Sequence, residues 1–222
     1  MNPERWTAVD AYLAGLFIPA DPALDNALET SAAAGLPPIN VAPNEGKFLH
    51  LLARLREARN ILEIGSLGGY STIWLARALP PGGRLVSLEL DPKHAAVARR
   101  NISRAGLADV VTLHVAPALE TLQKLIAEKH PPFDFVFIDA DKESYPAYFT
   151  SSLRLSRVGT CIVADNIIRQ GAVIEPDNAD PRVQGVRRFL DALAAEPRVT
   201  ATAMQTVGGK GYDGFAIALV SR

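Results

Sequence analysis

Short apolar runs alternate with amphipathic stretches along most of this chain, beginning at Asn60. Five runs have the length and residue types of buried strands; they cover residues 60–65, 84–90, 111–115, 133–139 and 159–166. Stretches with apolar positions at helical spacing follow these runs; they cover residues 70–79, 92–105, 117–129, 145–155 and 180–195. Regular alternation of strands and helices predicts a doubly wound α/β fold with a mostly parallel sheet.

The two ends of the chain depart from this alternation. Strand patterns at 199–206 and 213–220 have a glycine-rich stretch between them and no helical pattern, which predicts an antiparallel hairpin. Before residue 60, prolines interrupt the helical spacing and predict several short helices, the last of them capped by Asn44. We expect residues 1–58 to form an N-terminal helical cap or dimer segment within a single domain of residues 1–222.

Composition adds limits to this picture. The 222 residues are 48% hydrophobic and 21% charged, and the formal net charge is -1. These are globular values, and the charge does not favour nucleic-acid binding. No apolar run approaches the ~20 residues of a membrane helix, and the N-terminal residues lack an apolar signal core, so a cytoplasmic location without membrane contact is expected. The one cysteine, Cys161, lies in an apolar run and is expected to be buried.

The stretch NILEIGSLGGYS, residues 60–71, carries the first candidate chemistry. A strand that ends in glycines and opens onto a helix lets backbone amides approach a ligand closely. Leu67 stands where a dinucleotide loop has its second glycine, and Glu63 would face a pyrophosphate, so NAD is disfavoured. A compact cofactor fits better, with its carboxylate at Ser71 and its ribose at Glu89 on the end of the next strand. S-adenosylmethionine (SAM) has these groups together with a cationic centre.

Polar side chains at the ends of two later strands form a second candidate site. Asp139 ends one strand, and Asp165 and Asn166 end the next (165 − 139 = 26). A parallel sheet brings such ends together, and three oxygen ligands suit Mg²⁺, Mn²⁺ or Ca²⁺ rather than zinc. Lys142 is either a base at this site or a surface lysine. Tyr145 and Tyr148 are expected to cover the following helix.

The motifs LEIGSLGGYS, SLELDP, FVFIDADK and VADN together resemble the cation-dependent class I O-methyltransferases, which include catechol O-methyltransferase and the plant caffeoyl-CoA O-methyltransferases. The resemblance implies a seven-stranded sheet whose last strand is antiparallel, and SAM as the methyl donor. It implies that Asp139, Asp165 and Asn166 bind the metal, and that Lys142 is the catalytic base beside Asp139. The residues that it places around SAM are Val41, Glu63, Gly65, Ser66, Ser71, Glu89, Ala118 and Asp139.

The resulting hypothesis is metal-dependent methyl transfer from SAM to a hydroxyl of a catechol-like, phenolic small molecule. Two adjacent acceptor oxygens would chelate the metal while Lys142 accepts the proton. The loop 168–182 is a candidate lid, and the resemblance implies a homodimer. Three alternatives stay open at this point: an RNA-modifying methyltransferase that acts on a hydroxylated base, an NAD-binding oxidoreductase, and a non-catalytic cofactor-binding protein.

Overall fold

Seven strands form one sheet in the order β3-β2-β1-β4-β5-β7-β6 in the computed structural model of this chain, which describes residues 2–222. The strands are β1 (Asn60–Ile64), β2 (Arg84–Glu89), β3 (Val111–Val115), β4 (Phe133–Ile138), β5 (Ser156–Asp165), β6 (Val199–Gly208) and β7 (Gly211–Val220). Strands β1 to β5 pair in parallel, whereas β7 is antiparallel to both β5 and β6. The predicted fold, with its antiparallel last strand and hairpin, is confirmed.

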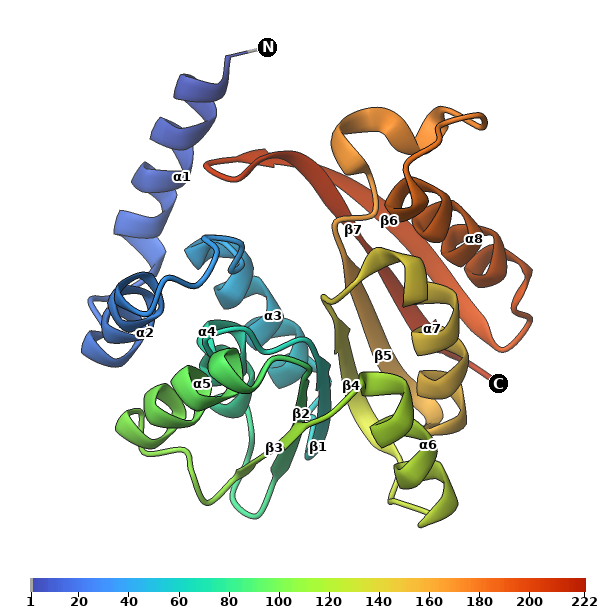
Figure 1. Cartoon of the computed structure of the whole chain (residues 1–222), viewed down its shortest axis with the longest axis horizontal. Coiled ribbons are helices and arrows are strands. Elements are labelled where there is room, and N and C mark those ends of the chain that lie inside the picture. Colours follow the sequence, from blue (N-terminus) through green and yellow to red (C-terminus); the bar gives the residue numbers. More distant parts are fainter. Residues whose placement is uncertain (1) are drawn as a thin grey trace.

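Helices cover both faces of this sheet (Figure 1). They are α1 (Pro3–Phe17), α2 (Pro22–Ala33), α3 (Pro43–Leu55), α4 (Tyr70–Ala76), α5 (Pro92–Arg104), α6 (Ala118–Ala127), α7 (Tyr145–Arg154) and α8 (Pro181–Ala195), with short 3-10 helices η1 (Lys142–Ser144) and η2 (Arg169–Ile174). One apolar core lies between the sheet and α2, α3 and α4, and a second lies between the sheet and α6, α7 and α8. Chain connections leave β1 and β4 toward opposite sides of the sheet, so their carboxyl ends form the switch point where ligands bind in such folds.

Proline sets the start of several helices, and this corrects one prediction. Pro43 is the first residue of α3 and Ala42 is its N-cap, so the prediction that Asn44 caps this helix is wrong. Proline fits the first helical position because it lacks the N–H that would have no partner there. The Asn44 amide instead donates to the carbonyl oxygen of Asp10 in α1, at 3.1 Å.

Helix α1 packs more loosely than the other long helices. None of its residues is buried. Figure 1 shows the tip of the β6–β7 hairpin pointing at the middle of this helix, where the N–H of Gly209 donates to Asp10 Oδ2 at 2.8 Å. The exposed apolar side chains of α1 are Val9, Tyr12, Leu16 and Phe17. A homodimer that covers this helix stays a prediction, which sedimentation analysis would test.

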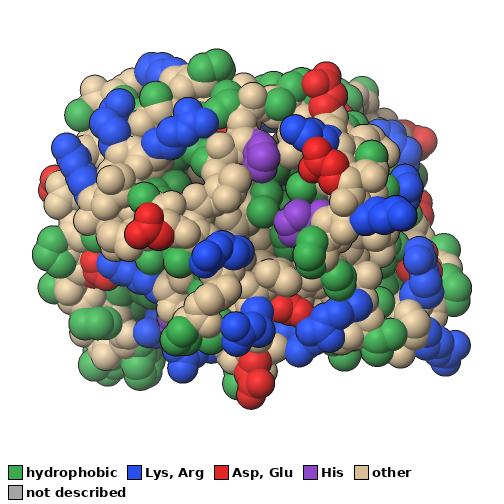
Figure 2. Space-filling model, turned by 90° about the horizontal axis from the view of Figure 1, so that it is seen from below, with side chains coloured by type: hydrophobic (Ala, Val, Ile, Leu, Met, Phe, Trp, Pro, Cys, Tyr) green, Lys and Arg blue, Asp and Glu red, His purple; other side chains and the backbone are tan. Residues whose placement is uncertain are grey.

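The composition led to expectations about both the surface and the interior. Within residues 2–222, no helix is both long enough and apolar enough to cross a membrane. Cys161 is buried, as expected. Figure 2 views the molecule from below Figure 1 and shows basic side chains in separate groups, with acidic, apolar and histidine side chains between them.

Candidate functional site

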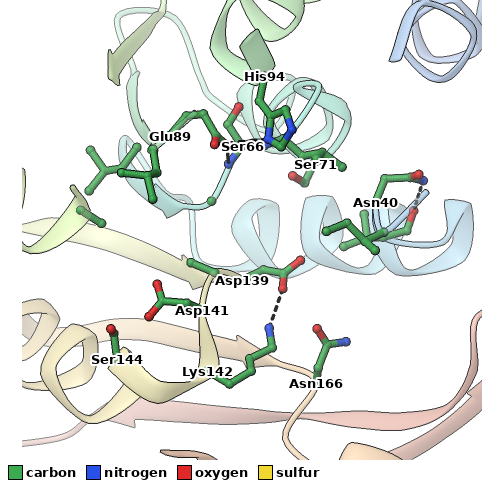
Figure 3. A pocket seen from close by; sticks show the side chains of 18 of the residues that line it. Asn40, Ser66, Ser71, Glu89, His94, Asp139, Asp141, Lys142, Ser144 and Asn166 are labelled. Atoms are coloured by element: carbon green, nitrogen blue, oxygen red, sulfur yellow. Dashed lines mark hydrogen bonds and ion pairs between the residues drawn. The ribbon is translucent and has the colours of Figure 1, made fainter. Parts of the chain in front are cut away.

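A pocket of about 780 Å³ opens at the carboxyl ends of β1, β2, β4 and β5 (Figure 3). Its volume is that of a typical small-molecule site. Nine of the predicted site residues line it: Val41, Gly65, Ser66, Ser71, Glu89, Ala118, Asp139, Lys142 and Asn166. The other two, Glu63 and Asp165, are buried beneath the lining. The structure thus gathers the predicted residues around one pocket, while their individual roles stay predictions.

Gly65 lets the end of β1 lie directly against the end of β4. Its φ is +98°, and a Cβ at this position would overlap the carbonyl oxygen of Asp139. Glycine alone combines this backbone conformation with so close an approach. The N–H of Asp139 donates to the carbonyl of Ile64 at 2.9 Å, and the N–H of Gly65 donates to that of Leu88 at 2.9 Å. The loop after β1 and the Asp139 side chain are therefore held side by side.

Glu89 organises the loop that follows β1. Its Oε2 accepts the backbone N–H groups of Ser66 (3.2 Å) and Leu67 (2.7 Å), and its Oε1 accepts that of Asp91 (3.0 Å). His94 Nδ1 lies 3.5 Å from Oε1. Leu67 has a φ of +49°, which is strained for a residue with a side chain, and its bond to Glu89 holds it there. The amides that would meet a pyrophosphate in a dinucleotide site are thus bonded to a carboxylate.

Glu63 is surrounded by hydroxyl groups. Ser71 Oγ donates to its Oε1 at 2.7 Å, while Thr72 Oγ1 and Ser87 Oγ donate to its Oε2 at 2.5 and 2.6 Å. Burial raises the pKa of this carboxyl to about 7, against the opposing effect of the three hydroxyl bonds. Glu63 is fully buried and reaches the pocket through Ser71, which lines it. Its direct contact with a cofactor stays a prediction.

Lys142 lies at the opposite end of the pocket. Its Nζ donates to Asp139 Oδ1 at 2.8 Å, drawn as a dashed line in Figure 3, and to the Tyr145 hydroxyl at 2.6 Å. Only 7% of Lys142 is exposed, so the surface-lysine alternative is wrong. Tyr145, which was expected to cover the following helix, is fully buried as the first residue of α7, and its hydroxyl also accepts a hydrogen bond from Lys142.

Asp165 and Asn166 form the turn at the end of β5. Asn166 has a φ of +55°, a left-handed conformation that asparagine tolerates. Asp165 Oδ1 accepts the Asn166 N–H at 2.6 Å, and Oδ2 accepts its Nδ2 at 3.1 Å, which leaves the Asn166 amide oxygen free of these bonds. Burial, followed by the charges of Glu45 and Asp139, raises the pKa of Asp165 well above its ordinary value.

Glu45 is a site residue that the sequence reasoning missed. It lies in the first turn of α3, where its Oε2 accepts the Ala42 N–H at 3.4 Å. Burial, followed by the charge of Asp139, raises its pKa to about 7. Glu45, Asp139 and Asp165 therefore place three carboxyl groups at one end of the pocket. No motif links Glu45 to the distant strand ends, so only the packing of α3 brings it there.

Several further residues line the pocket although they were not among the predicted site residues: Asn40, His94, Asp141, Ser144, Tyr148, Arg169 and Arg182. Asp141 lies inside the FIDADK motif and accepts a hydrogen bond from the Tyr148 hydroxyl. Arg169 and Arg182 come from the 168–182 segment, which therefore reaches the pocket, and Arg182 is paired with Asp180. Movement of this segment as a lid stays a prediction.

The donor set fits a hard divalent cation. Within residues 2–222, no group of three or more His, Cys, Asp and Glu side chains is arranged to hold a metal. The predicted trio is different, since it combines two carboxylates with the amide oxygen of Asn166. These donors are all oxygens, and the excess of buried carboxyl groups beside them favours a positive charge. Metal binding by Asp139, Asp165 and Asn166 stays a prediction.

Comparisons with known proteins match nearly the whole chain, including the residues at both ends of the pocket. The sequence matches the O-methyltransferase family over residues 19–218. It is 54% identical over 220 residues to the catechol O-methyltransferase of Niastella koreensis. The aligned region covers 99% of this chain and 100% of that relative. The O-methyltransferase from Bacillus cereus in complex with SAH has a TM-score of 0.98 and 57% identity, covering 99% and 100% of the two chains. TomG of Streptomyces achromogenes, an O-methyltransferase involved in tomaymycin synthesis and solved with SAM, has a TM-score of 0.97 and 51% identity, covering 100% of both chains.

Proposed function

This chain belongs to the O-methyltransferase family and is a SAM-dependent O-methyltransferase, and we propose that it methylates a vicinal dihydroxy, catechol-like small molecule with the help of a divalent cation. Family membership excludes the alternatives of an NAD-binding oxidoreductase and a non-catalytic binding protein. A hydroxylated RNA base, the other acceptor considered, serves below as the contrasting substrate.

One observation carries this proposal. The Lys142–Asp139 pair and Asn166 lie at one end of the same pocket whose other end is the glycine loop after β1, as Figure 3 shows. A base and oxygen donors are therefore within one cavity of the predicted SAM-binding groups. The relative from Niastella koreensis, named a catechol O-methyltransferase, supports an acceptor with two adjacent hydroxyls.

SAM and the divalent cation each have a defined place in this proposal. When bound, SAM supplies an electrophilic methyl group, and a divalent cation such as Mg²⁺ supplies Lewis acidity that favours the ionised acceptor hydroxyl. We place the cation on Asp139, Asp165 and Asn166. We place SAM against Val41, Glu63, Gly65, Ser66, Ser71, Glu89, Ala118 and Asp139. The raised pKa of Asp165 supports this arrangement, because a cation would offset the repulsion between neighbouring carboxylates.

Lys142 accepts the proton of the acceptor hydroxyl in this mechanism. Its Nζ belongs to a residue of the pocket wall and is held by hydrogen bonds to Tyr145 and Asp139. Because Lys142 is almost fully buried, little water competes with the acceptor at this position. The proton remains on Nζ until the methylated product leaves and solvent returns.

Chelation is the direct test of the cation. We expect removal of divalent metal to lower catechol turnover by about 100-fold or more, because the acceptor loses its Lewis acid, while SAM binding by calorimetry persists. Adding Mg²⁺ should restore turnover. Asp165→Asn should remove this metal response, whereas Asp191→Asn, on the exposed side of α8, should keep it.

Two results would contradict the proposal. Full catechol turnover by protein shown to be free of metal would mean that the reaction does not need a cation. Turnover of a hydroxylated nucleoside in RNA, together with none of catechol or related diols, would replace the acceptor class.

A further inference from the structure

Tyr145 joins three parts of the reaction end of the pocket through one hydroxyl group. Its oxygen lies 2.6 Å from Lys142 Nζ, 3.1 Å from the carbonyl oxygen of Ile138 and 3.0 Å from that of Asp165. Ile138 is the last residue of β4 and Asp165 is the last of β5. The ring is fully buried and packs against Phe189 with 5.7 Å between centroids. The hydroxyl is therefore fixed in place from all sides.

The direction of these hydrogen bonds follows from the chemistry of the partners. Backbone carbonyls only accept, so the single hydroxyl hydrogen of Tyr145 must be shared between Ile138 and Asp165. The phenol keeps this hydrogen because two carbonyl oxygens accept it inside a fully buried setting. Toward Lys142 the oxygen can then only accept. Nζ must direct one N–H at Tyr145.

A second N–H of Lys142 is committed in the same way. Asp139 Oδ1 lies 2.8 Å from Nζ and has no hydrogen to give when ionised. A lysine that accepts a proton is a neutral amine with two hydrogens and one lone pair. When Tyr145 and Asp139 take both hydrogens, the lone pair occupies the remaining tetrahedral direction. Since Lys142 lines the pocket while Tyr145 is buried behind it, that direction is the one open to an acceptor.

We propose that Tyr145 is a positioning residue which orients the lone pair of Lys142 toward the acceptor hydroxyl. This inference rests on the proposed function, because it presumes that Lys142 is the base. The acceptor O–H bond breaks, its hydrogen forms a third N–H bond on Nζ, and its electron pair stays on the acceptor oxygen. Throughout, Tyr145 and Asp139 hold the other two N–H groups, so the amine does not rotate away from the acceptor.

Tyr145 also ties the ends of β4 and β5 together, and the experiment must separate this structural effect from orientation of the base. Two acceptors of different acidity make the separation. Catechol needs a base to lose its proton near neutral pH, whereas 4-nitrocatechol is already largely ionised there and needs little help. Damage to the spacing of the strand ends slows both, while a misdirected lone pair slows mainly catechol.

Tyr145→Phe is the test variant, because it keeps the ring and its packing but removes the hydroxyl. We expect kcat for catechol to fall on the order of tenfold, and kcat for 4-nitrocatechol to change within about twofold. KM for both acceptors and the calorimetric Kd of SAM should stay close to those of the wild type. An equal loss with both acceptors, or no loss with either, would overturn the inference.

Thr160→Val is the matched control for loss of a buried hydroxyl. Thr160 Oγ1 donates to the carbonyl oxygen of Phe133 at 2.6 Å, at the other end of the same two strands. This variant should lower Tm and leave the ratio of the two acceptor rates unchanged. Should Tyr145→Phe fail to fold, 3-fluorotyrosine at position 145, a weaker acceptor, should reduce the catechol rate selectively, and an equal effect on both acceptors would again overturn the inference.

Lys142→Met distinguishes failure of this inference from failure of the proposed function. If Lys142 is the base, this variant must lose catechol turnover far more than 4-nitrocatechol turnover. A selective loss in Lys142→Met without one in Tyr145→Phe would overturn only the role of Tyr145. If Lys142→Met slows both acceptors equally, Lys142 is not the base, and the positioning role of Tyr145 fails with it.

Discussion

At the β1–β2 end of the pocket, every carboxylate oxygen of Glu63 and Glu89 accepts a hydrogen bond, whereas at the β4–β5 end three carboxyl groups lie together near one bonded amino group, that of Lys142. The three carboxyl groups belong to Glu45, Asp139 and Asp165. Backbone N–H groups and hydroxyls supply the donors at the first end. The two ends thus differ in how much of their electrostatic balance the protein itself provides.

This difference matches what each end is proposed to hold. A complete hydrogen-bond network is preorganised, so its side chains need not rearrange when a cofactor enters. An end where three carboxyl groups crowd together gains stability from a bound cation, which favours their ionised forms. The contrast predicts that substitutions at the β1–β2 end affect stability and binding through backbone geometry and burial. Substitutions at the β4–β5 end should affect them through charge.

Gly65→Ala should have the largest effect, because Gly65 is where the two ends touch. A left-handed alanine and its overlap with the Asp139 carbonyl should together destabilise the fold by about 4 kcal/mol. We also expect SAM binding to be lost, since the loop after β1 must move. Urea unfolding and calorimetry measure both effects.

Gly106→Ala is the matched control for this prediction. Gly106 also has a positive φ, +72°, but a Cβ there would have no neighbour within 4 Å. It should therefore lose only the backbone contribution of about 1 kcal/mol and keep SAM affinity. Equal stability losses in the two variants would show that the contact with Asp139 is unimportant.

Glu63→Gln should change how stability depends on pH. The pKa of Glu63 is raised from 4.5 to about 7, so the neutral form favours the fold. This stabilisation is fully present below pH 4.5 and is lost as pH rises through about 7; a shift of this size corresponds to about 3 kcal/mol. In the Gln variant the group cannot ionise. We therefore expect the unfolding free energy to decline less between pH 4.5 and 8, as measured by urea unfolding.

Glu29→Gln, an exposed change on α2, is the control and should preserve the wild-type decline. A decline in Glu63→Gln as steep as that of the wild type would mean that burial of Glu63 carries no free-energy penalty on ionisation.

Strand boundaries and the residues at strand ends were predictable because both follow from local pattern. Apolar runs placed β2 and β3 within one residue, and the parallel topology brought Asp139 and Asp165 together from 26 positions apart. The start of β5 was missed because Ser156 and Arg157 are polar, although Ser156 pairs with Phe133 beyond an irregularity in the ladder.

The supporting residues were harder to predict because they depend on tertiary packing. Glu45 reaches the site only through the placement of α3, and Arg169 only through the fold of the segment after β5. Tyr145 did carry a signal, since it lies three residues after Lys142 in sequence. Its role became visible only when the two strand ends that share its hydroxyl were seen side by side.

His94→Ala should have the smallest effect, because the Glu89 carboxylate beside it has other hydrogen-bond donors. His94 Nδ1 lies 3.5 Å from Glu89 and the side chain is partly exposed, while three backbone N–H groups already bond to that carboxylate. A contact of 3.5 Å at the weak end of hydrogen bonding contributes about 0.5 kcal/mol, so we expect the Kd of SAM to rise about two- to threefold. His130→Ala, in the loop before β4, should leave the Kd unchanged. A tenfold or greater weakening in His94→Ala would mean that the β1–β2 end depends on one basic side chain as heavily as the β4–β5 end depends on Lys142, and the contrast between the two ends would then lie in their ligands rather than in the protein.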